Sequence, residues 1–455
     1  MSASALRPSV PDPPDRPLNL FQFLRAVRTN ALTIWPRCAY DEPVFSRHFV
    51  GRMNILLNDP EAIHHVLVTN ASNYRRSPAS IRILRPITGD GLILSEGEAW
   101  KFQRRTVAPA FAPRVIPLLA RHIVNATRDA IVRLNARAGQ PIDLLAEMQG
   151  LALEIAGRSM FSLEMEQHGA AMRRLLTQFA ERHSRPGLLD MLLPSQIPTP
   201  GDFGRARFKR RWMALIESIL ASRLATPPPE APADLLDVLR SARDPETGRA
   251  LSMQQLRDQV ATLILAGHET TAVTLFWALF MLAQAPAEQA IVAQEAAATL
   301  IEPETAGSVL PGLVQTRAVI NETLRLFPPA FTVVREAIGS DRVGEVRLSP
   351  RTIVMIAPWV LHRHRSLWDD PEVFLPSRFG PNQSPPPRYA FLPFGAGPRV
   401  CVGAQFAMAE AVLILASLMR EFRISLPDGG PVPPVAIVTT QPGRQVFAEF
   451  SRRSR

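Results

Sequence analysis

The sequence predicts a mainly α-helical fold with a small β region. Helical patterns recur along most of the chain, and the longest candidate, residues 254–284, would extend roughly 45 Å at about 1.5 Å per residue. Runs typical of β-strands gather near the two ends, between Val44 and Leu57 and again over residues 433–450. A helix-rich chain with strands in two short regions is typical of an α-dominated fold with a minor sheet.

The composition limits the classes of protein to consider. The chain has 455 residues, of which 46% are hydrophobic, enough for a substantial core. Its two cysteines exclude a disulfide framework and a Cys-rich zinc or iron–sulfur site, and we expect a cytoplasmic location. The net charge of +10 permits an anionic partner, but there is no long Lys/Arg block, so we expect no nucleic-acid binding.

The sequence predicts one large domain with a short extension. Residues 1–17 are a Pro-rich N-terminal extension without the apolar segment of a signal peptide, and residues 18–455 form the domain. The Pro-rich stretch 226–232 predicts a surface connection. Residues 18–35 are apolar, but Arg25 and other polar residues interrupt them well before the length of a transmembrane helix. We expect an amphipathic helix packed on the domain, with peripheral membrane contact as the alternative and no transmembrane segment.

The elements of the first hundred residues follow from turn signals and periodicity. Residues 44–57 predict short strands, and an Asn-Asp-Pro turn introduces a short helix over 60–68. Residues 77–95 are apolar but aperiodic and contain proline and glycines, which predicts a long loop, a kind of segment that tends to be functional. A helix is expected over 98–111.

The helix over 98–111 carries two notable side chains. Trp100 and Arg104 stand at i and i+4 and therefore share a face. An ordinary amphipathic helix is one interpretation. The other is a clamp for an anionic group, since an indole N–H and a guanidinium lie side by side.

The centre of the long helix is polar although its flanks are apolar. Its middle reads Gly267-His268-Glu269-Thr270-Thr271. Ionisable residues inside a membrane span are costly, so a buried helix that crosses the core and faces a site is favoured over a transmembrane helix. A zinc-protease helix is excluded, because Ala272 stands where that signature needs its second histidine.

A Gly-rich loop over residues 391–403 contains Cys401 and leads into a helix over 404–416. The cysteine stands at the positive end of the helix dipole, which favours the thiolate, and an anionic sulfur in such a loop suits an axial ligand of haem iron. Gly397 and Gly403 permit close approach of the backbone. A plain buried cysteine is the alternative. A dinucleotide-binding loop is excluded, because its third glycine would fall at Val400.

The pattern Phe394-x-x-Gly397-x-Arg399-x-Cys401-x-Gly403 resembles the haem-binding loop of cytochromes P450. Three further motifs resemble the same family in the same order along the chain. They are Trp100-x-x-x-Arg104, the segment Ala266-Gly267-His268-Glu269-Thr270-Thr271, and Glu322-x-x-Arg325 with Arg378 as the third member.

The resemblance implies roles for individual residues. It implies haem b with Cys401 as the proximal ligand, in a loop that also contains Phe394, Gly397 and Gly403. Propionates would be held by Trp100, Arg104, Arg335 and Arg399. Ala266 and Gly267 would leave room for dioxygen, Thr270 would donate a hydrogen bond to it and Glu269 would deliver protons. A structural network would comprise Glu322, Arg325 and Arg378. Candidate substrate contacts are Leu84, Ile87, Leu92, Phe331, Val333 and Val438.

The function that the resemblance implies is monooxygenation of a lipophilic small molecule by dioxygen. Electrons from NAD(P)H would arrive through separate proteins, a ferredoxin or flavodoxin with its reductase. Two alternatives are open. One is a non-enzymatic haem-thiolate sensor or electron carrier, and the other is a peroxide-driven or isomerising relative. The acid–alcohol pair Glu269 and Thr270 argues against the latter, in which this pair is usually replaced.

Overall fold

The computed structural model describes residues 6–49, 51–162, 168–225, 227 and 230–453. Its α-helices are α1 (Leu20–Thr29), α2 (Pro60–His64), α3 (Pro78–Thr88), α4 (Gly97–Val107), α5 (Ile116–Asn135), α6 (Leu144–Phe161), α7 (Gly169–Gln178), α8 (Leu188–Leu192), α9 (Pro200–Leu224), α10 (Leu235–Ser241), α11 (Met253–Gln284), α12 (Pro286–Ala297), α13 (Ala306–Val309), α14 (Val314–Leu326), α15 (Pro358–Leu361) and α16 (Ala404–Glu421).

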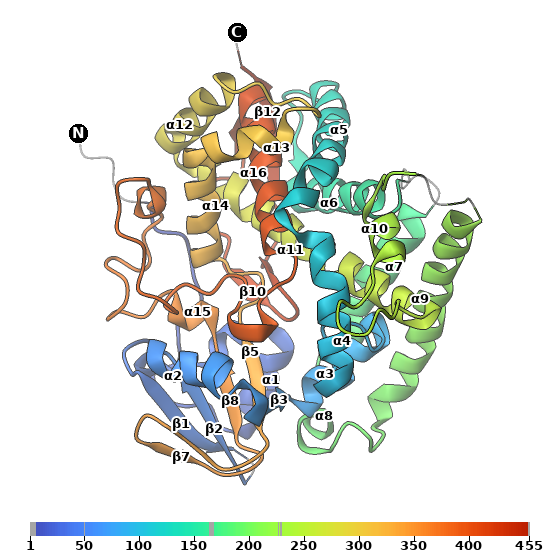
Figure 1. Ribbon diagram of the computed structural model, residues 1–455. Helices are drawn as coiled ribbons and strands as arrows, with labels where there is room; N and C mark the ends of the chain where they lie inside the picture. Colours follow the sequence, from blue (N-terminus) through green and yellow to red (C-terminus); the bar gives the residue numbers. More distant parts are fainter. Residues whose placement is uncertain (1–5, 50, 163–167, 226, 228–229, 454–455) are drawn as a thin grey trace.

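The strands are short and form a minor part of the fold. They are β1 (Val44–Phe49), β2 (Arg52–Leu57), β3 (Tyr74–Arg76), β4 (Ile142–Asp143), β5 (Val333–Ala337), β6 (Asp341–Val343), β7 (Val346–Leu348), β8 (Ile353–Ile356), β9 (Phe422–Ser425), β10 (Pro434–Ala436), β11 (Thr440–Pro442) and β12 (Phe447–Arg452). The main sheet has the order β1-β2-β8-β5-β3, and only β2 and β8 are parallel. It lies at one end of the molecule, and helices with a few short strands make up the rest, as the sequence predicts (Figure 1).

Helix α11 crosses the centre of the molecule beside α16 (Figure 1). Its N-terminal half contributes Leu256 to Leu265 to one hydrophobic core, and its C-terminal half contributes Ala272 to Leu282 to another. By length and composition this helix could cross a membrane, yet 72% of its apolar window is buried inside the protein. The polar middle of α11 is therefore held between two cores, where its side chains can face a site.

Two secondary-structure predictions are wrong. Residues 77–95 are not one loop, because they contain α3. Ser77 caps this helix by accepting from the Ser80 N–H at 3.3 Å, Pro78 occupies its first turn, and Gly89 at φ 59° ends it. These start and stop signals outweigh the missing periodicity. The sequence of residues 433–450 also predicts a pair of strands around Pro442-Gly443, but β10 pairs with β11 around residues 437–439, and β12 pairs with β9 and β4.

The other predictions of local structure are close to the observed elements. Residues 44–57 form β1 and β2, and the helix predicted over 60–68 is α2 followed by the π-helical turn η3 (His65–Thr69). The N-terminal extension packs on the domain through Leu6 and Val10. Part of the Pro-rich stretch 226–232 lies outside the described residues.

Candidate functional site

A cavity of about 750 Å³ lies between the middle of α11, the Gly-rich loop before α16, and residues of α3, α4 and β5. Most of the residues that the sequence singles out line it. They are Leu84, Leu92, Trp100, Arg104, Ala266, Gly267, Glu269, Thr270, Phe331, Val333, Arg335, Phe394, Arg399, Cys401, Gly403 and Val438. The motifs are thus brought together around one space, although they are spread over more than 350 residues of sequence.

Ile87 and Gly397 do not line the cavity. The Ile87 side chain is fully buried in a hydrophobic core, and its carbonyl accepts from the indole N–H of Trp212 at 2.7 Å. The assignment of Ile87 as a substrate contact is therefore wrong. Gly397, at φ 71°, faces the backbone of Leu67, where a Cβ would lie 1.9 Å from the carbonyl oxygen. Its backbone approaches η3 closely, and no sulfur contact is recorded for it.

Cys401 is exposed on the cavity at the end of the Gly-rich loop. Its N–H donates to the Phe394 carbonyl at 2.9 Å, which closes the loop. Burial raises the pKa of the Cys401 thiol, while the Gly403 N–H and the charge of Arg104 act in the opposite direction. The expectation that the position by itself favours the thiolate is therefore wrong, because desolvation is the larger effect. A bound metal cation would reverse that balance.

Two arginines face each other across the edge of the main sheet. In the β3–β5 ladder Arg76 stands directly opposite Arg335. Like charges in this position repel, whereas the neighbouring register pair, Arg75 with Glu336, forms an ion pair at 2.6 Å. The Arg335 guanidinium donates only to the adjacent Val334 carbonyl, and among the described residues the buried Nε of Arg76 has no partner.

Arg104 and Arg399 are further cations at the cavity. Arg399 pairs with Glu96 and lies over the ring of Trp100, 4.5 Å from the ring centroid. Arg76 was not identified from the sequence. The strand that precedes Ser77 is the signal that could have identified it. Adjacent side chains of a strand point to opposite faces, so Arg75 and Arg76 must point in different directions.

The arginine cluster lacks counter-charge. Burial, together with Arg335 and Arg399, lowers the pKa of Arg76 to about 9, and burial together with Arg399 lowers the pKa of Arg335 to about 10. In the described part of the chain, Glu96 is the carboxylate paired with this group. Several buried arginines that share one paired carboxylate fit a ligand with two carboxylates, such as the propionates of haem.

The middle of α11 presents Glu269, Thr270 and Thr271 to the cavity. The Thr270 hydroxyl donates to the Ala266 carbonyl at 2.5 Å. The Glu269 carboxylate accepts from the Thr439 hydroxyl at 2.8 Å and from the Gln441 amide at 2.6 Å. Burial raises the pKa of Glu269, and these two donors oppose that effect. The Glu269 side chain is therefore hydrogen-bonded to the β10–β11 hairpin.

Glu410 on α16 is a further buried acid beside the cavity that the sequence analysis missed. Its carboxylate accepts from the Thr271 hydroxyl of α11 at 3.0 Å. Burial raises the pKa of Glu410 to about 8, so it is mostly neutral at pH 7. In the sequence this residue looks like any acidic position of a helix, and only the packing of α16 on α11 reveals its burial.

Glu410 should make stability depend on pH between about 4.5 and 8. Its pKa is raised in the folded state above the ordinary value of 4.5, so the stabilising effect is complete below pH 4.5 and is lost as the pH rises through 8. Between these pH values we expect the wild type to lose unfolding free energy on the order of a few kcal/mol because of Glu410, and Glu410→Gln should abolish this loss. Urea unfolding of both proteins at pH 5 and pH 8 measures it. Parallel changes in the two proteins would contradict the assignment.

The Glu322, Arg325 and Arg378 network lies behind the loop of Cys401. Arg325 donates to both oxygens of Glu322, at 2.7 and 2.8 Å, and both side chains are fully buried. Arg378 lies at the rim, 3.6 Å from Glu322. Arg325 also donates to the carbonyls of His362, Pro371 and Val373. The structure thus joins the three residues that the sequence grouped.

His362 links this network to the cysteine loop. Its Nε2 accepts from the Leu392 N–H at 2.9 Å, at the start of the loop. Burial and the charges of Arg325 and Arg363 lower the pKa of His362 to about 3, so the ring is neutral and can accept. The turn-rich sequence around His362 indicates a structural residue rather than a ligand, and this contact agrees with that interpretation.

Three comparisons identify similar proteins. A family model described as Cytochrome P450 matches residues 9–446. Cyclooctatin synthase of Streptomyces melanosporofaciens is 34% identical, over 80% of this chain and 79% of that protein. Cyclooctat-9-en-7-ol 5-monooxygenase of the same species is 30% identical, over 75% of this chain and 74% of that protein. The solved haem domain of cytochrome P450DA has a TM-score of 0.83 at 23% identity, covering 98% of this chain and 97% of that one.

Proposed function

The chain belongs to the cytochrome P450 family, and from this premise we propose how its own residues perform haem-thiolate monooxygenation. The enzyme is an oxidoreductase that uses haem and dioxygen. The observation that carries the assignment of residues is Cys401, exposed on an apolar cavity that is also lined by Arg76, Arg104 and Arg335, three arginines without an ion pair among the described residues. When bound, haem b activates dioxygen with two electrons and two protons, so that one oxygen atom enters the substrate and the other leaves as water.

Each group around the cavity has a proposed role. Cys401 is the iron ligand, and the Gly403 N–H tunes its donation. The propionates are held by Trp100, Arg104, Arg335, Arg399 and also Arg76. Ala266 and Gly267 form the wall beside the reacting oxygen. Thr270 turns its hydroxyl from the Ala266 carbonyl to the reacting oxygen, and Glu269 holds the proton that follows.

The substrate is proposed to be a hydrocarbon-rich small molecule. Among the predicted contacts, Leu84, Leu92, Phe331, Val333 and Val438 line the cavity and are all apolar. Two similar bacterial proteins are named for the synthesis of cyclooctatin and for oxidation of a cyclic alkenol. The cavity volume of about 750 Å³ lies in the range of pockets that bind small molecules.

Electrons are proposed to come from NAD(P)H through a separate ferredoxin or flavodoxin with its reductase. Lys101, Arg105 and Arg388 are candidate contacts for this electron-transfer partner. The Arg105 side chain, however, already forms an ion pair with Asp244 at 2.8 Å. A cytoplasmic location is proposed with it. Peripheral membrane contact is the alternative. It is supported by Phe21 on α1, which is 85% exposed.

Turnover with surrogate partners tests the function. Purified enzyme with a ferredoxin, its reductase and NADPH should consume dioxygen and form a product that contains one of its atoms across a panel of lipophilic compounds. Isotopically labelled dioxygen identifies the inserted atom. A haem-loaded protein that yields no product across the panel would favour a sensor or electron carrier. Turnover that needs only peroxide would favour the peroxide-driven alternative.

Thr270→Ala is expected to uncouple dioxygen use from product formation. The Thr270 hydroxyl is the donor proposed to serve the reacting oxygen, so its removal should lower product per dioxygen consumed by roughly tenfold, while consumption continues. The ratio of product to dioxygen measures the effect. Thr270→Ser keeps the hydroxyl and is the control. Unchanged coupling in the alanine variant would contradict the role.

Arg76→Gln is expected to weaken haem retention by about tenfold, because one charge-assisted contact to a propionate is lost. Transfer of haem to apomyoglobin measures the rate of loss. Arg75→Gln is the matched control, since Arg75 is the neighbour in the same strand and pairs with Glu336. Equal haem loss in both variants would indicate a general effect on the sheet edge.

A further inference from the structure

A second cavity, of about 300 Å³, lies between the π-helical turn η7 (Phe179–His183) and α9. None of its residues lines the large cavity. Three of the lining residues are arginines and none is a carboxylate; the lining comprises Gln178, Arg182, His183, Gly204, Arg207, Phe208 and Arg211. Its side chains therefore offer mainly hydrogen-bond donors and positive charge.

The positive charge around this cavity is uncompensated. Residues 168–211 contain nine Lys or Arg and three Asp or Glu, which accounts for +6 of the net charge of +10. Of the three acids, Asp190 and Asp202 are engaged by Arg205 and Arg82. Within the described residues, no ion pair or hydrogen bond involves the side chains of Arg182, Arg207 or Arg211. Two of these arginines, Arg207 and Arg211, stand at i and i+4 of α9, where like charges destabilise a helix.

His183 adds an unpaired polar atom to the same cavity. Its Nε2 is buried and has no hydrogen-bond partner in the part of the chain that the structure describes. The ring packs on Phe208, with 5.3 Å between centroids. A Cβ at Gly204 would lie 3.3 Å from the Cε1 atom of His183, so glycine leaves the ring room in this position. A buried nitrogen without a partner costs free energy unless a ligand pairs with it.

We propose that this cavity binds a phosphate-type oxyanion. The arginine forks match the oxygens of a phosphate group, and the His183 ring supplies a further N–H in the tautomer that is protonated at Nε2. The inference is independent of the monooxygenase function, because it uses none of the residues assigned to haem or substrate.

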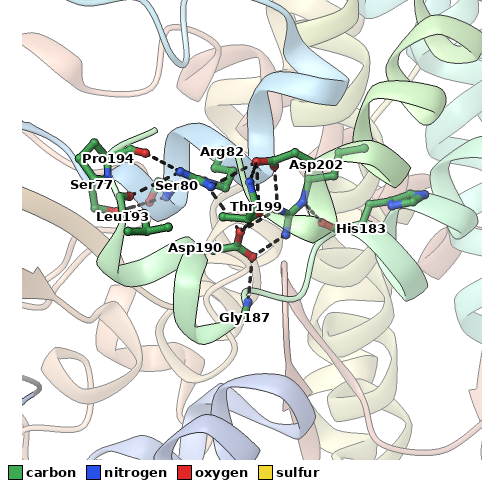
Figure 2. Close-up of polar contacts among 11 residues, drawn as sticks. Ser77, Ser80, Arg82, His183, Gly187, Asp190, Leu193, Pro194, Thr199 and Asp202 are labelled. Atoms are coloured by element: carbon green, nitrogen blue, oxygen red, sulfur yellow. Dashed lines mark hydrogen bonds and ion pairs between the residues drawn. The ribbon is translucent and has the colours of Figure 1, made fainter. Parts of the chain in front are cut away.

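The oxyanion site is connected to the wall of the large cavity. The His183 carbonyl accepts from Arg205, which pairs with Asp190 at 2.8 Å and with Asp202. Asp202 in turn accepts from Arg82 of α3 at 3.2 Å. Figure 2 shows Arg82 between Asp202 on one side and the carbonyl groups of residues 193–194 on the other.

Segments on both sides of this network line the large cavity, and the lining residues are Ser77, Ser80, Ile83, Ser184, Pro186, Met191 and Leu192. An oxyanion that fixes His183 is therefore expected to stabilise residues 184–192. This segment forms part of the wall beside which substrate must pass.

Phosphate titration of the full-length, haem-loaded enzyme tests the site. Inorganic phosphate is expected to raise Tm above the value in chloride of equal ionic strength, and calorimetry should give a binding isotherm. The double variant Arg207→Gln with Arg211→Gln should bind at least about tenfold more weakly, since two charge-assisted contacts are lost. Arg210→Gln is the charge-matched control, because Arg210 is exposed on α9 but does not line the cavity. It should bind phosphate as the wild type does.

Vesicles distinguish the source of the oxyanion. Wild type and double variant are sedimented with phosphatidylcholine vesicles that contain or lack phosphatidic acid. Phosphate binding in solution identifies a free anion, and vesicle binding that only the double variant loses identifies a lipid headgroup; both support the site. No binding in either arm, or equal losses in Arg210→Gln and the double variant, would overturn it. Slower amide exchange of residues 184–192 in phosphate would support the connection to the wall, and unchanged exchange would refute it.

Discussion

Cys401→Ala is expected to abolish monooxygenation and the red-shifted Soret band of the reduced carbon monoxide adduct. Cys401 is the proposed iron ligand, and a thiolate ligand of haem would supply the electron donation on which both the band and the cleavage of dioxygen depend. Among the described residues no group of three or more His, Cys, Asp or Glu side chains could replace it as a metal site. Turnover should fall to the background of a protein-free reaction.

Cys38→Ala is the matched control for this prediction. Cys38 does not line the large cavity, and it lies in a 3-10 turn with residues 37–40. Burial and the neighbouring Glu42 raise the pKa of its thiol, and Glu42 supplies negative charge where Cys401 has the positive charge of Arg104. The variant should keep both the band and turnover. A band that survives in Cys401→Ala but disappears in Cys38→Ala would refute the ligand assignment.

Motifs with fixed local spacing could be predicted from the sequence. Trp100 and Arg104 share a helix face by periodicity alone, and the apolar flanks of α11 indicate a buried helix. The loop of Cys401 carries its geometry in its glycines, since Gly395 and Gly397 have φ values of 72° and 71°. In these places the local sequence preferences and the tertiary structure agree, so short segments of the sequence are sufficient to predict the structure.

Features that depend on contacts between distant segments could not be predicted in this way. The role of Arg76 follows from its register opposite Arg335, which β-strand pairing across more than 250 residues creates. The high pKa of Glu410 follows from the packing of α16 on α11. Ile87 was misassigned because an apolar residue next to a cavity and one in the adjacent core look alike in sequence. Helix α3 was not predicted, because its apolar residues do not follow a helical period. Its capping signals are Ser77 and Gly89.

The charge pair behind the cysteine loop should be the most sensitive structural element of the chain. Glu322 and Arg325 are both fully buried, and each is held by two hydrogen bonds to the other. Removing one partner leaves a buried charge without compensation, which typically costs about 3–5 kcal/mol. Arg325→Ala would in addition leave the carbonyls of three residues, 362, 371 and 373, without this donor.

Arg325→Ala is therefore expected to yield little haem-loaded protein, because a loss of about 3–5 kcal/mol is a large part of the stability of a typical domain. Lysine at this position keeps the charge but cannot provide the planar fork that binds both oxygens of Glu322, so Arg325→Lys should also be strongly destabilised. Urea midpoints and haem content of the purified variants measure the effect.

Arg378→Lys is the control, because Arg378 makes the longer contact to Glu322, at 3.6 Å, and is less buried than Arg325, so this variant should cost less stability than Arg325→Lys. The Arg325 variants should also loosen the cysteine loop, since the His362 that binds Leu392 is anchored by Arg325 through its carbonyl. Faster amide exchange at residues 391–395 in the lysine variant, but not in Arg378→Lys, would show this. Wild-type urea midpoints and haem content in both Arg325 variants would show that the network contributes neither to stability nor to the position of the loop.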